Sequence, residues 1–477
     1  MAKSRVGYQN VDDDYHEDRS LKKGAAGWVL LAGLGVSYVI SGDYAGWNFG
    51  LDEGGWGGLM IAAILMGLMY TCMVFGLAEM SSALPVAGAG YGFARRALGP
   101  IGGFATGVAV LIEYAVAPAA IATFIGGYVE ALGLFGLTNG WPVYLGAYVI
   151  FIGVHLYGVG EALKLMFGIT AIAVVALVAA VIGLAPKFST SNLFDIAPNG
   201  STMSSDFLPF GISGVVAALV YGIWFFLAVE GVPLAAEETE SPERDMPRGI
   251  IVAMLVLLVT AALMLLVVPG AAGSEAVRTS DNPLPAAIRA VYGSSSLLAD
   301  FVNYAGLAGL VASFFSIIYA YSRQLFALSR AGYLPKVLSL TSGRNTPWVA
   351  LIVPGTIGFL LAALTQDGAL LINIAVFGAT TSYVLLNLSH IMLRRREPDL
   401  ERAYRTPGGV VTTGIGLVLS LVAVAATFFV DINAAGITAA VFVAALAYFW
   451  FYSRHHLVAS APEEEFAHLD EAESELE

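Results

Sequence analysis

Charged residues are scarce in this chain. Asp, Glu, Lys and Arg make up 12% of its 477 residues, whereas hydrophobic residues make up 57%. Soluble domains carry about 25% charged residues, so this composition excludes an ordinary soluble domain. It predicts an all-α polytopic membrane protein embedded in the lipid bilayer.

The chain also has few residues that could build metal or redox sites. Cys72 is its single cysteine, which excludes an intramolecular disulfide, and the apolar run around it indicates a small core residue. The histidines are scattered or terminal, so there is no Cys/His cluster of the zinc type. GAGYGF, residues 88–93, lies in no βα unit, and no phosphate-binding loop is present. These absences argue against an enzyme, a metal site, a bound cofactor and a nucleotide-driven pump.

Acidic residues outnumber basic ones, and the formal net charge is -13. Thirteen of the 36 acidic residues lie in the two tails: Asp12, Asp13, Asp14, Glu17, Asp18, Glu463, Glu464, Glu465, Asp470, Glu471, Glu473, Glu475 and Glu477. Charge concentrated in this way predicts solvated, disordered ends rather than a surface for a specific partner. We expect no nucleic acid partner.

Long apolar runs fill the rest of the sequence. Because a membrane-spanning helix needs about 20 apolar residues, we count twelve transmembrane helices. They cover residues 26–50, 56–80, 101–131, 142–158, 161–184, 209–234, 249–270, 300–329, 347–365, 369–392, 411–430 and 434–453. The first 24 residues are polar and charged, and the first apolar run is too long for a signal sequence, so we expect no cleavable signal peptide.

The basic residues support this count and give an orientation. With the N-terminus in the cytoplasm, twenty of the 23 Lys and Arg residues fall on cytoplasmic segments, and only Lys187, Arg278 and Arg289 fall outside. Cytoplasmic loops of membrane proteins carry an excess of Lys and Arg. The sequence therefore predicts a multi-pass protein of the cytoplasmic membrane with both termini in the cytoplasm.

Two of the predicted spans are interrupted. The first contains SGDYAG, residues 41–46, and the sixth contains WFFLAVEG, residues 224–231. A carboxylate near the bilayer centre costs at least ~2.5 kcal/mol on insertion scales, so Asp43 is a candidate functional residue. Paired interruptions at corresponding positions of two halves indicate a transporter with a binding site at the membrane midplane.

Because the interruptions lie five spans apart, the second half of the core is predicted to repeat the first half upside down. The predicted division is a cytoplasmic N-terminal tail (1–25), a first inverted repeat (26–184), a second inverted repeat with its preceding extracellular loop (185–392), a loop with two further helices (393–453) and an acidic cytoplasmic tail (454–477).

Several segments carry a family resemblance. GLAEMSSALPVAGAGYGFARRALGP after the second span, AAEETESPERDMPRGI after the sixth and SRQLFALSRAGYLP after the eighth resemble loops of the amino acid-polyamine-organocation (APC) transporters. YVISGDYAGWNFGL and LIEYAVAPAAIATF resemble the ethanolamine permease family within that superfamily. The resemblance implies a LeuT-type 5+5 inverted repeat with broken helices 1 and 6, two extra C-terminal helices, alternating access, and a solute held between the two breaks.

The first break predicts the charge of that solute. In amino acid members of the superfamily it typically reads Gly-Ser-Gly, and its backbone N–H groups receive the substrate carboxylate. The corresponding residues here are Ser41, Gly42, Asp43 and Tyr44. At ~4 Å and an effective dielectric constant of about 20, an ionised Asp43 would attract an ammonium or repel a carboxylate by ~4 kcal/mol. This favours an amine without a carboxylate; the alternative is that Asp43 only caps the outer half of the helix.

The second break offers aromatic rings and freed carbonyls. Trp224 and Phe225 can hold an ammonium by cation-π attraction. The resemblance implies that the carbonyls of Trp224 and Leu227 accept its N–H bonds. The alternative is that these rings are ordinary core or lipid-facing side chains.

Two carboxylates lie close to this site in the sequence. Glu230 follows the second break, where related transporters carry a glutamate used in gating or proton relay. Glu113, in the third span, is a second candidate for gating or proton coupling, and its neighbour Tyr114 is a candidate contact for the solute. A structural ion pair or a polar contact between helices is the alternative for both residues of the third span.

The coupling ion stays open between H⁺ and Na⁺. Sodium-coupled relatives use carbonyls of the first span and hydroxyls of the eighth, where Ser313 and Ser316 stand in this chain. Serines in membrane helices also serve as ordinary packing contacts. Many sodium-independent relatives place a lysine of the fifth span in this space, where this chain has Ala173.

The sequence thus predicts a secondary transporter that imports ethanolamine or a closely related small amine. An amino acid permease of the same superfamily is the alternative, and an amine-gated channel or receptor ranks below both. At the cytoplasmic end, inner-gate ion pairs are expected among Glu79, Arg95, Arg96, Glu237, Glu238 and Arg244.

Overall fold

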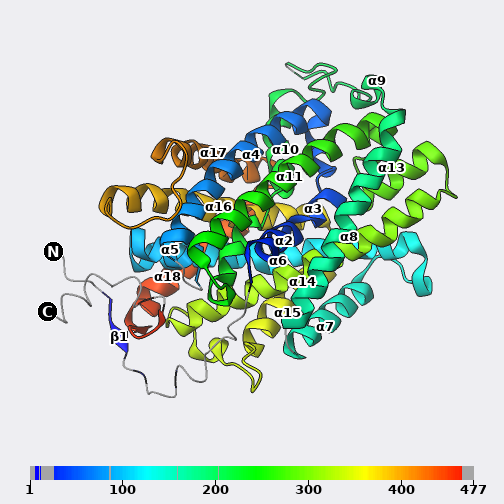
Figure 1. The fold of residues 1–477 in the computed structure, drawn as a ribbon. Coiled ribbons are helices and arrows are strands. Elements are labelled where there is room, and N and C mark those ends of the chain that lie inside the picture. The colour runs from blue at the N-terminus through cyan, green and yellow to red at the C-terminus, as the bar shows by residue number, and fades with distance from the viewer. Residues whose placement is uncertain are drawn as a thin grey trace.

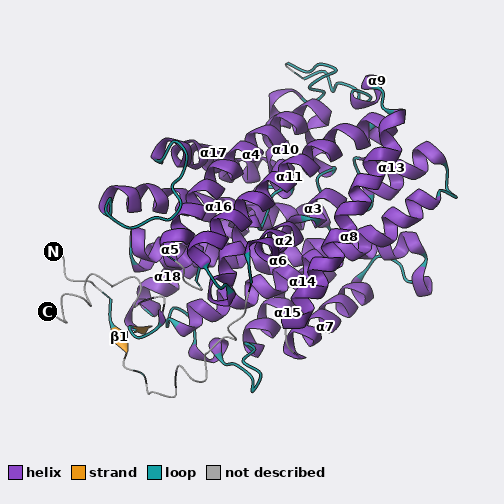
Figure 2. Cartoon of the chain, viewed as in Figure 1, coloured by secondary structure: helices purple, strands orange, loops and turns teal. Residues whose placement is uncertain are grey.

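The chain folds into a bundle of helices (Figure 2). The computed structural model describes residues 6–9, 11, 15, 26–84, 88–157, 160–201, 203–462 and 464, without the side chains of 160–164, 237 and 238. Turns and loops connect the helices, and two short strands, β1 (Tyr8–Gln9) and β2 (Leu457–Val458), are present among these residues. The predicted all-α class is confirmed.

The long helices follow one another with short connections. In the first half they are α2 (Trp28–Val39), α3 (Ser41–Tyr44), α4 (Phe49–Ala83), α5 (Gly90–Leu98), α6 (Pro100–Leu132), α7 (Trp141–Tyr157) and α8 (Gly160–Leu184). In the second half they are α10 (Gly211–Trp224), η3 (Val229–Glu238), α11 (Pro242–Ala272), α14 (Leu297–Arg330), α15 (Trp348–Thr365), α16 (Gly368–Arg396), α17 (Val410–Val430) and α18 (Ile432–Phe451). Short helices connect them: η1 (Leu134–Gly136), η2 (Ala185–Lys187), α9 (Thr190–Leu193), α12 (Ser274–Val277), α13 (Pro283–Tyr292), η4 (Lys336–Ser339) and η5 (Ser453–His455).

Ten helices of the described chain are long and apolar enough to cross a membrane. Two shorter apolar helices, α2 and α7, stand where the first and fourth spans are predicted. Side chains on the outside of the bundle are apolar, as on Ile182 of α8, which is 68% exposed. An apolar exterior of this kind suits contact with lipid.

Helix α4 contains parts of two predicted spans. Gly55 inside it has a non-helical backbone (φ 65°, ψ -179°). A positive φ favours glycine, and a Cβ at this position would lie 2.2 Å from Cγ of Pro209. Residues 49–54 therefore complete the first span, and residues 56–83 form the second.

The breaks in the first and sixth spans meet near the centre of the bundle. Helix α10 packs along α4, α16 and α14 pack along α6, and α11 packs along α2 and α4 (Figure 1). A continuous apolar core runs between these helices and includes Trp47, Tyr44 and Phe225, each 0% exposed.

A second apolar core joins the two tails to the bundle. It contains Tyr15, Leu457, Val458 and Ala461 of the tails together with Tyr333 of the connection after α14. Strand β1 pairs in parallel with β2, and Figure 1 shows β1 near α5 and α18. The prediction of solvated tails is therefore wrong for these described parts, because apolar side chains bring them onto the bundle.

Candidate functional site

The first break lies at the end of SGDYAG, directly after Ser41–Tyr44, the residues where the resemblance placed it. Residues Ser41–Tyr44 form a helical turn, α3, that continues from α2. The backbone then becomes extended at Ala45 (φ -160°, ψ 160°) and turns at Gly46 (φ 94°). The interruption thus falls within SGDYAG as predicted, but at its Ala-Gly end, where glycine tolerates the positive φ.

The turn α3 contacts a different helix with each of its residues. Ser41 Oγ lies 2.9 Å from Ser313 Oγ of α14, and the Tyr44 hydroxyl donates to the Ala173 carbonyl of α8 at 2.7 Å. Asp43 lies beside Thr260 of α11. These predicted substrate residues therefore do not all point into one space.

Gly42 faces the second break. A Cβ on Gly42 would lie 2.4 Å from the carbonyl oxygen of Trp224, so only glycine allows this approach. The second break begins as α10 ends at Trp224, and Ala228 has a left-handed backbone (φ 81°). The predicted interruption of the sixth span is confirmed.

Aromatic contacts join the two breaks. The Trp224 indole N–H donates to the carbonyl of Ala45 at 2.9 Å, which satisfies an acceptor that the first break leaves free. The rings of Trp47 and Phe225 stack with centroids 5.7 Å apart. Leu227, also predicted at the site, is buried with them.

Asp43 is buried, with 2% of its surface exposed. Its Oδ1 atom has no hydrogen-bond donor among the described residues. The outer half of the first span begins with α4, whose N-cap is Asn48, and no side-chain hydrogen bond caps it. The geometry therefore gives no support to the capping alternative and leaves an acceptor for a cationic or hydrogen-bonding group.

Glu230 and Glu113 lie together just beyond the second break. The Tyr114 hydroxyl donates to Glu230 Oε1 at 3.0 Å, so this predicted solute contact is engaged by a carboxylate. The Tyr383 hydroxyl lies 3.1 Å from Glu230 Oε2 and 3.3 Å from Glu113 Oε1. Tyr70 adds a fourth group, with its hydroxyl 2.6 Å from that of Tyr383.

The described side chains around Glu113 and Glu230 offer too few hydrogen-bond donors to satisfy two ionised carboxylates. A tyrosine has one hydroxyl proton, so Tyr383 can donate to Glu113 or to Glu230 but not to both. Glu113 Oε2 has no donor among the described residues, and the two carboxylates lie beside each other. Two buried negative charges at this separation repel strongly. One proton held between Glu113 and Glu230 would remove the repulsion and supply the missing donor.

Serine pairs join the first span to α14. Ser37 Oγ lies 2.7 Å from Ser316 Oγ, and Ser41 pairs with Ser313. The Ser313 hydroxyl donates to the Tyr38 carbonyl at 2.6 Å. These contacts are those expected of helix packing, and the cation site at Ser313 and Ser316 stays a prediction.

Comparison with known proteins gives the family. The sequence model of the amino acid permease family matches residues 29–466. An uncharacterised transporter of Rhizobium meliloti is 30% identical over 404 residues, covering 83% of this chain and 84% of that protein. The branched-chain amino acid permease BcaP of Bacillus subtilis is 27% identical over 466 residues, covering 92% and 95%. The methylthioribose transporter of the same organism is 27% identical over 399 residues, covering 79% and 80%.

The chain belongs to the amino acid permease family.

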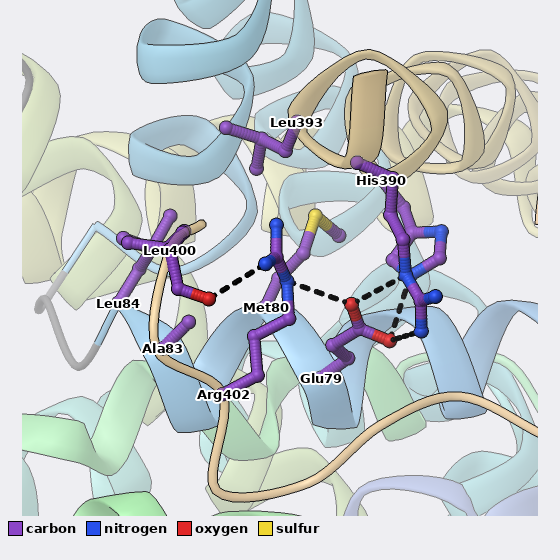
Figure 3. A pocket seen from close by; sticks show the side chains of 9 residues that line it. Glu79, Met80, Ala83, Leu84, His390, Leu393, Leu400 and Arg402 are labelled. Carbon is purple, nitrogen blue, oxygen red and sulfur yellow. Dashed lines mark hydrogen bonds and ion pairs between the residues drawn. The ribbon is translucent and has the colours of Figure 1, made fainter. Parts of the chain in front are cut away.

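Membership agrees with the predicted APC-type fold, and the relatives are transporters and permeases rather than enzymes. In this permease Glu79, Arg95 and Arg96 all take part in ion pairs. Glu79 accepts from Arg394 at 2.6 Å and from Arg402 at 2.9 Å, and His390 Nε2 lies 3.1 Å away (Figure 3). The backbone N–H of Thr406 also donates to Glu79. Glu79 thereby fixes the loop after α16 to the end of α4.

The two arginines of α5 pair with acidic residues from the C-terminal part of the chain. Arg96 pairs with Glu397 at 2.6 Å, and Arg95 pairs with Glu464 of the C-terminal tail at 2.6 Å. Burial lowers the pKa of Arg95, but Tyr333 and Glu464 beside it raise that pKa above its ordinary value. The side chains of Glu237 and Glu238 lie outside the described residues, and among the described side chains Arg244 forms no ion pair. The described partners of Glu79, Arg95 and Arg96 thus come from α16, the loop after it and the C-terminal tail, and the predicted pairs with Glu237 and Glu238 stay a prediction.

Sequence reasoning missed three groups of the permease's residues: the tyrosines around Glu230, the tail residue Glu464, and Asn48 after the first break. Tyr70 and Tyr383 lie inside apolar spans, where a tyrosine gives no signal without its neighbours. Glu464 stands in an acidic run that looks solvated. Asn48 could have been noticed, since it is a polar residue two positions after Gly46 in an apolar run.

Proposed function

We propose that this permease is a secondary transporter that carries an amino acid across the cytoplasmic membrane by alternating access. The observation that carries the proposal is the direct packing of two broken helices, with Trp224 bonded to Ala45 and Gly42 set against the Trp224 carbonyl. Broken helices leave backbone groups available to a polar solute within the membrane. Relatives named as amino acid permeases support an amino acid over ethanolamine.

A small amine such as ethanolamine is the second candidate. It is favoured by Asp43, a buried carboxylate with an unpaired oxygen in the turn before the first break. An amine without a carboxylate would gain from this charge, whereas the carboxylate of an amino acid would have to lie away from it. The site residues of this proposal are those predicted: Ser41, Gly42, Asp43, Tyr44, Tyr114, Trp224, Phe225 and Leu227.

We assign proton coupling to Glu113 and Glu230. Their shared tyrosine and the unpaired Glu113 Oε2 favour one proton held between them. A carboxylate pair that gains and loses one proton as the site opens to either side would link solute movement to the proton gradient. Sodium remains the competing ion, with Ser313 and Ser316 as its predicted contacts.

Uptake by the purified permease in liposomes tests the substrate. Labelled leucine, alanine and ethanolamine are offered separately with an imposed proton or sodium gradient. The proposal expects saturable uptake of leucine or alanine, with counterflow when the inside is preloaded. Uptake of ethanolamine alone would favour the second candidate, and non-saturable flux would indicate a channel instead.

The orientation is part of the proposal. We propose that both termini lie in the cytoplasm, because cytoplasmic loops carry an excess of Lys and Arg and the basic loops fall on the side predicted for the tails. A protease added to intact cells should leave a tag at either terminus uncut, and cleavage of the tag without permeabilisation would reverse the assignment.

A further inference from the structure

Asn48 connects the first break to the loop between α11 and α13. Its side chain is fully buried. The amide nitrogen donates to the carbonyls of Val277 at 2.8 Å and Ser280 at 2.9 Å, and it lies 3.3 Å from that of Arg278. An asparagine amide has two N–H donors, so both are used on one loop.

The carbonyl of the same side chain serves the break itself. Asn48 Oδ1 accepts the backbone N–H of Gly46 at 3.1 Å, the residue whose positive φ makes the turn. The carbonyl of Ala45, one residue earlier, accepts the Trp224 indole. A chain of hydrogen bonds therefore runs from the second break through the first break to the loop.

The loop is short and lies at the end of the bundle opposite the tails. We call residues 273–282, which include α12 and the turn before α13, the outer lid (Figure 1). Val277 of the outer lid is fully buried in the main core. Most of its other polar links lie nearer the surface: Glu275 N–H bonds to Asp195, Arg278 pairs with Asp52 at 3.2 Å, and Asn139 donates to Asp281 at 3.3 Å. Links exposed to solvent are weak, so the buried hydrogen bonds hold the outer lid: that of Ser274 to the Leu193 carbonyl at 3.0 Å, and those of the Asn48 amide, which reach the first break.

We infer that Asn48 is a positioning residue for transport, which holds the outer lid closed when the first break has its present geometry. The Asn48 amide is rigid, and it bonds Gly46 through Oδ1 and the outer lid through its N–H groups. A movement of Gly46 as solute enters or leaves would therefore also shift the N–H groups that hold the outer lid. Closure of the outer lid would then follow the state of the break. This inference rests on the transport proposed above but not on the identity of the solute.

A labelling experiment tests the attachment without any transport assay. The full-length permease carries Cys72→Ala to remove its native thiol and Val277→Cys as a reporter under the outer lid. Asn48→Asp removes both amide donors and keeps the size of the side chain. Asn192→Asp is the matched control, since the Asn192 amide also donates to two backbone carbonyls, those of Gly270 and Ala271.

The purified variants are exposed to a maleimide, and their thermal unfolding is recorded to confirm that they fold. Asn48→Asp is expected to raise the labelling rate at least about tenfold, whereas Asn192→Asp should stay within about twofold of the parent, because only the former raises the open population of the outer lid. Equal labelling rates in the two folded variants would overturn the inference.

A disulfide across the edge of the outer lid gives a second test that does not alter Asn48. A Cβ on Gly127 of α6 would lie 2.7 Å from Cβ of Asp281, so Gly127→Cys with Asp281→Cys needs a shift of about 1 Å to reach disulfide geometry. The oxidised protein is expected to lose uptake and to recover it with dithiothreitol. Unchanged uptake in the fully oxidised protein would show that the outer lid need not move, and would leave the assignment of the solute untouched.

Discussion

Buried carboxylates in this permease differ in what surrounds them, and their neighbours separate their roles. Glu79 is met by arginines and a backbone N–H, which describes a structural ion pair. Glu230 is met by tyrosine hydroxyls and by Glu113, which describes a site for a proton. Asp43 keeps an oxygen without a donor in the described structure, which suits a transient partner. All were visible in the sequence as charges in apolar runs, but their partners come from distant helices.

Asp43→Asn tests whether this carboxylate meets an amine. An ion pair desolvated in the membrane is worth far more than one in water, so the variant should weaken competition by ethanolamine about tenfold or more. Inhibition of labelled amino acid uptake by unlabelled ethanolamine is the measurement. Asp300→Asn, at an exposed position paired with Arg289, is the control. If ethanolamine competes equally well with both variants, Asp43 is not its partner.

At the scale of elements, the turn α3 determines how the two breaks pack against each other. The glycines and the aspartate of SGDYAG predicted an interruption, and the structure has one. Its position at Ala45 and Gly46 could not be predicted, because the contacts that keep Ser41–Tyr44 helical come from α8, α10, α11 and α14. The predicted site residues consequently surround the breaks instead of lining one wall.

Gly42→Ala tests the close approach of the breaks. The added methyl group would meet the Trp224 carbonyl at 2.4 Å, and relief of such overlap typically costs about 1–3 kcal/mol. We expect uptake to fall at least about tenfold, since the breaks must separate to accept the methyl group. Gly146→Ala is the control, because no atom lies within 4 Å of a Cβ at that position of α7. Normal uptake by Gly42→Ala would show that this contact is not needed for transport.

At the scale of the molecule, described residues of both tails pack against the bundle. Glu464 accepts from Arg95 and from the Tyr333 hydroxyl at 2.8 Å, and it is fully buried. The Tyr8 hydroxyl of the N-terminal tail also donates to Glu464, at 3.4 Å. Burial raises the pKa of Tyr8 to about 12. Composition alone predicted solvated tails, because nothing in the sequence distinguishes the buried Glu464 from the acidic residues on either side of it.

Glu464→Gln should reduce the stability of the permease. Removing one partner of a buried ion pair leaves the other charge unpaired and costs on the order of 3 kcal/mol. The midpoint of thermal unfolding in detergent, recorded at one scan rate, is expected to fall. Glu397→Gln breaks the more exposed pair with Arg96 and should lower the midpoint less, since such pairs contribute about 1 kcal/mol or less. Equal midpoints for the two variants would contradict the role given to the tail.

Concentrative uptake driven by a proton gradient tests the central claim most directly. Liposomes containing the permease, Glu113→Gln, Glu230→Gln or the control Glu130→Gln are given an inward proton gradient and labelled leucine or alanine. Glu130 lies on the same helix as Glu113 but at its exposed end. The account predicts accumulation above equilibrium by the native protein and by Glu130→Gln, and loss of accumulation in the other two variants. Accumulation that persists in both Glu113→Gln and Glu230→Gln, or that requires sodium instead of protons, would contradict it.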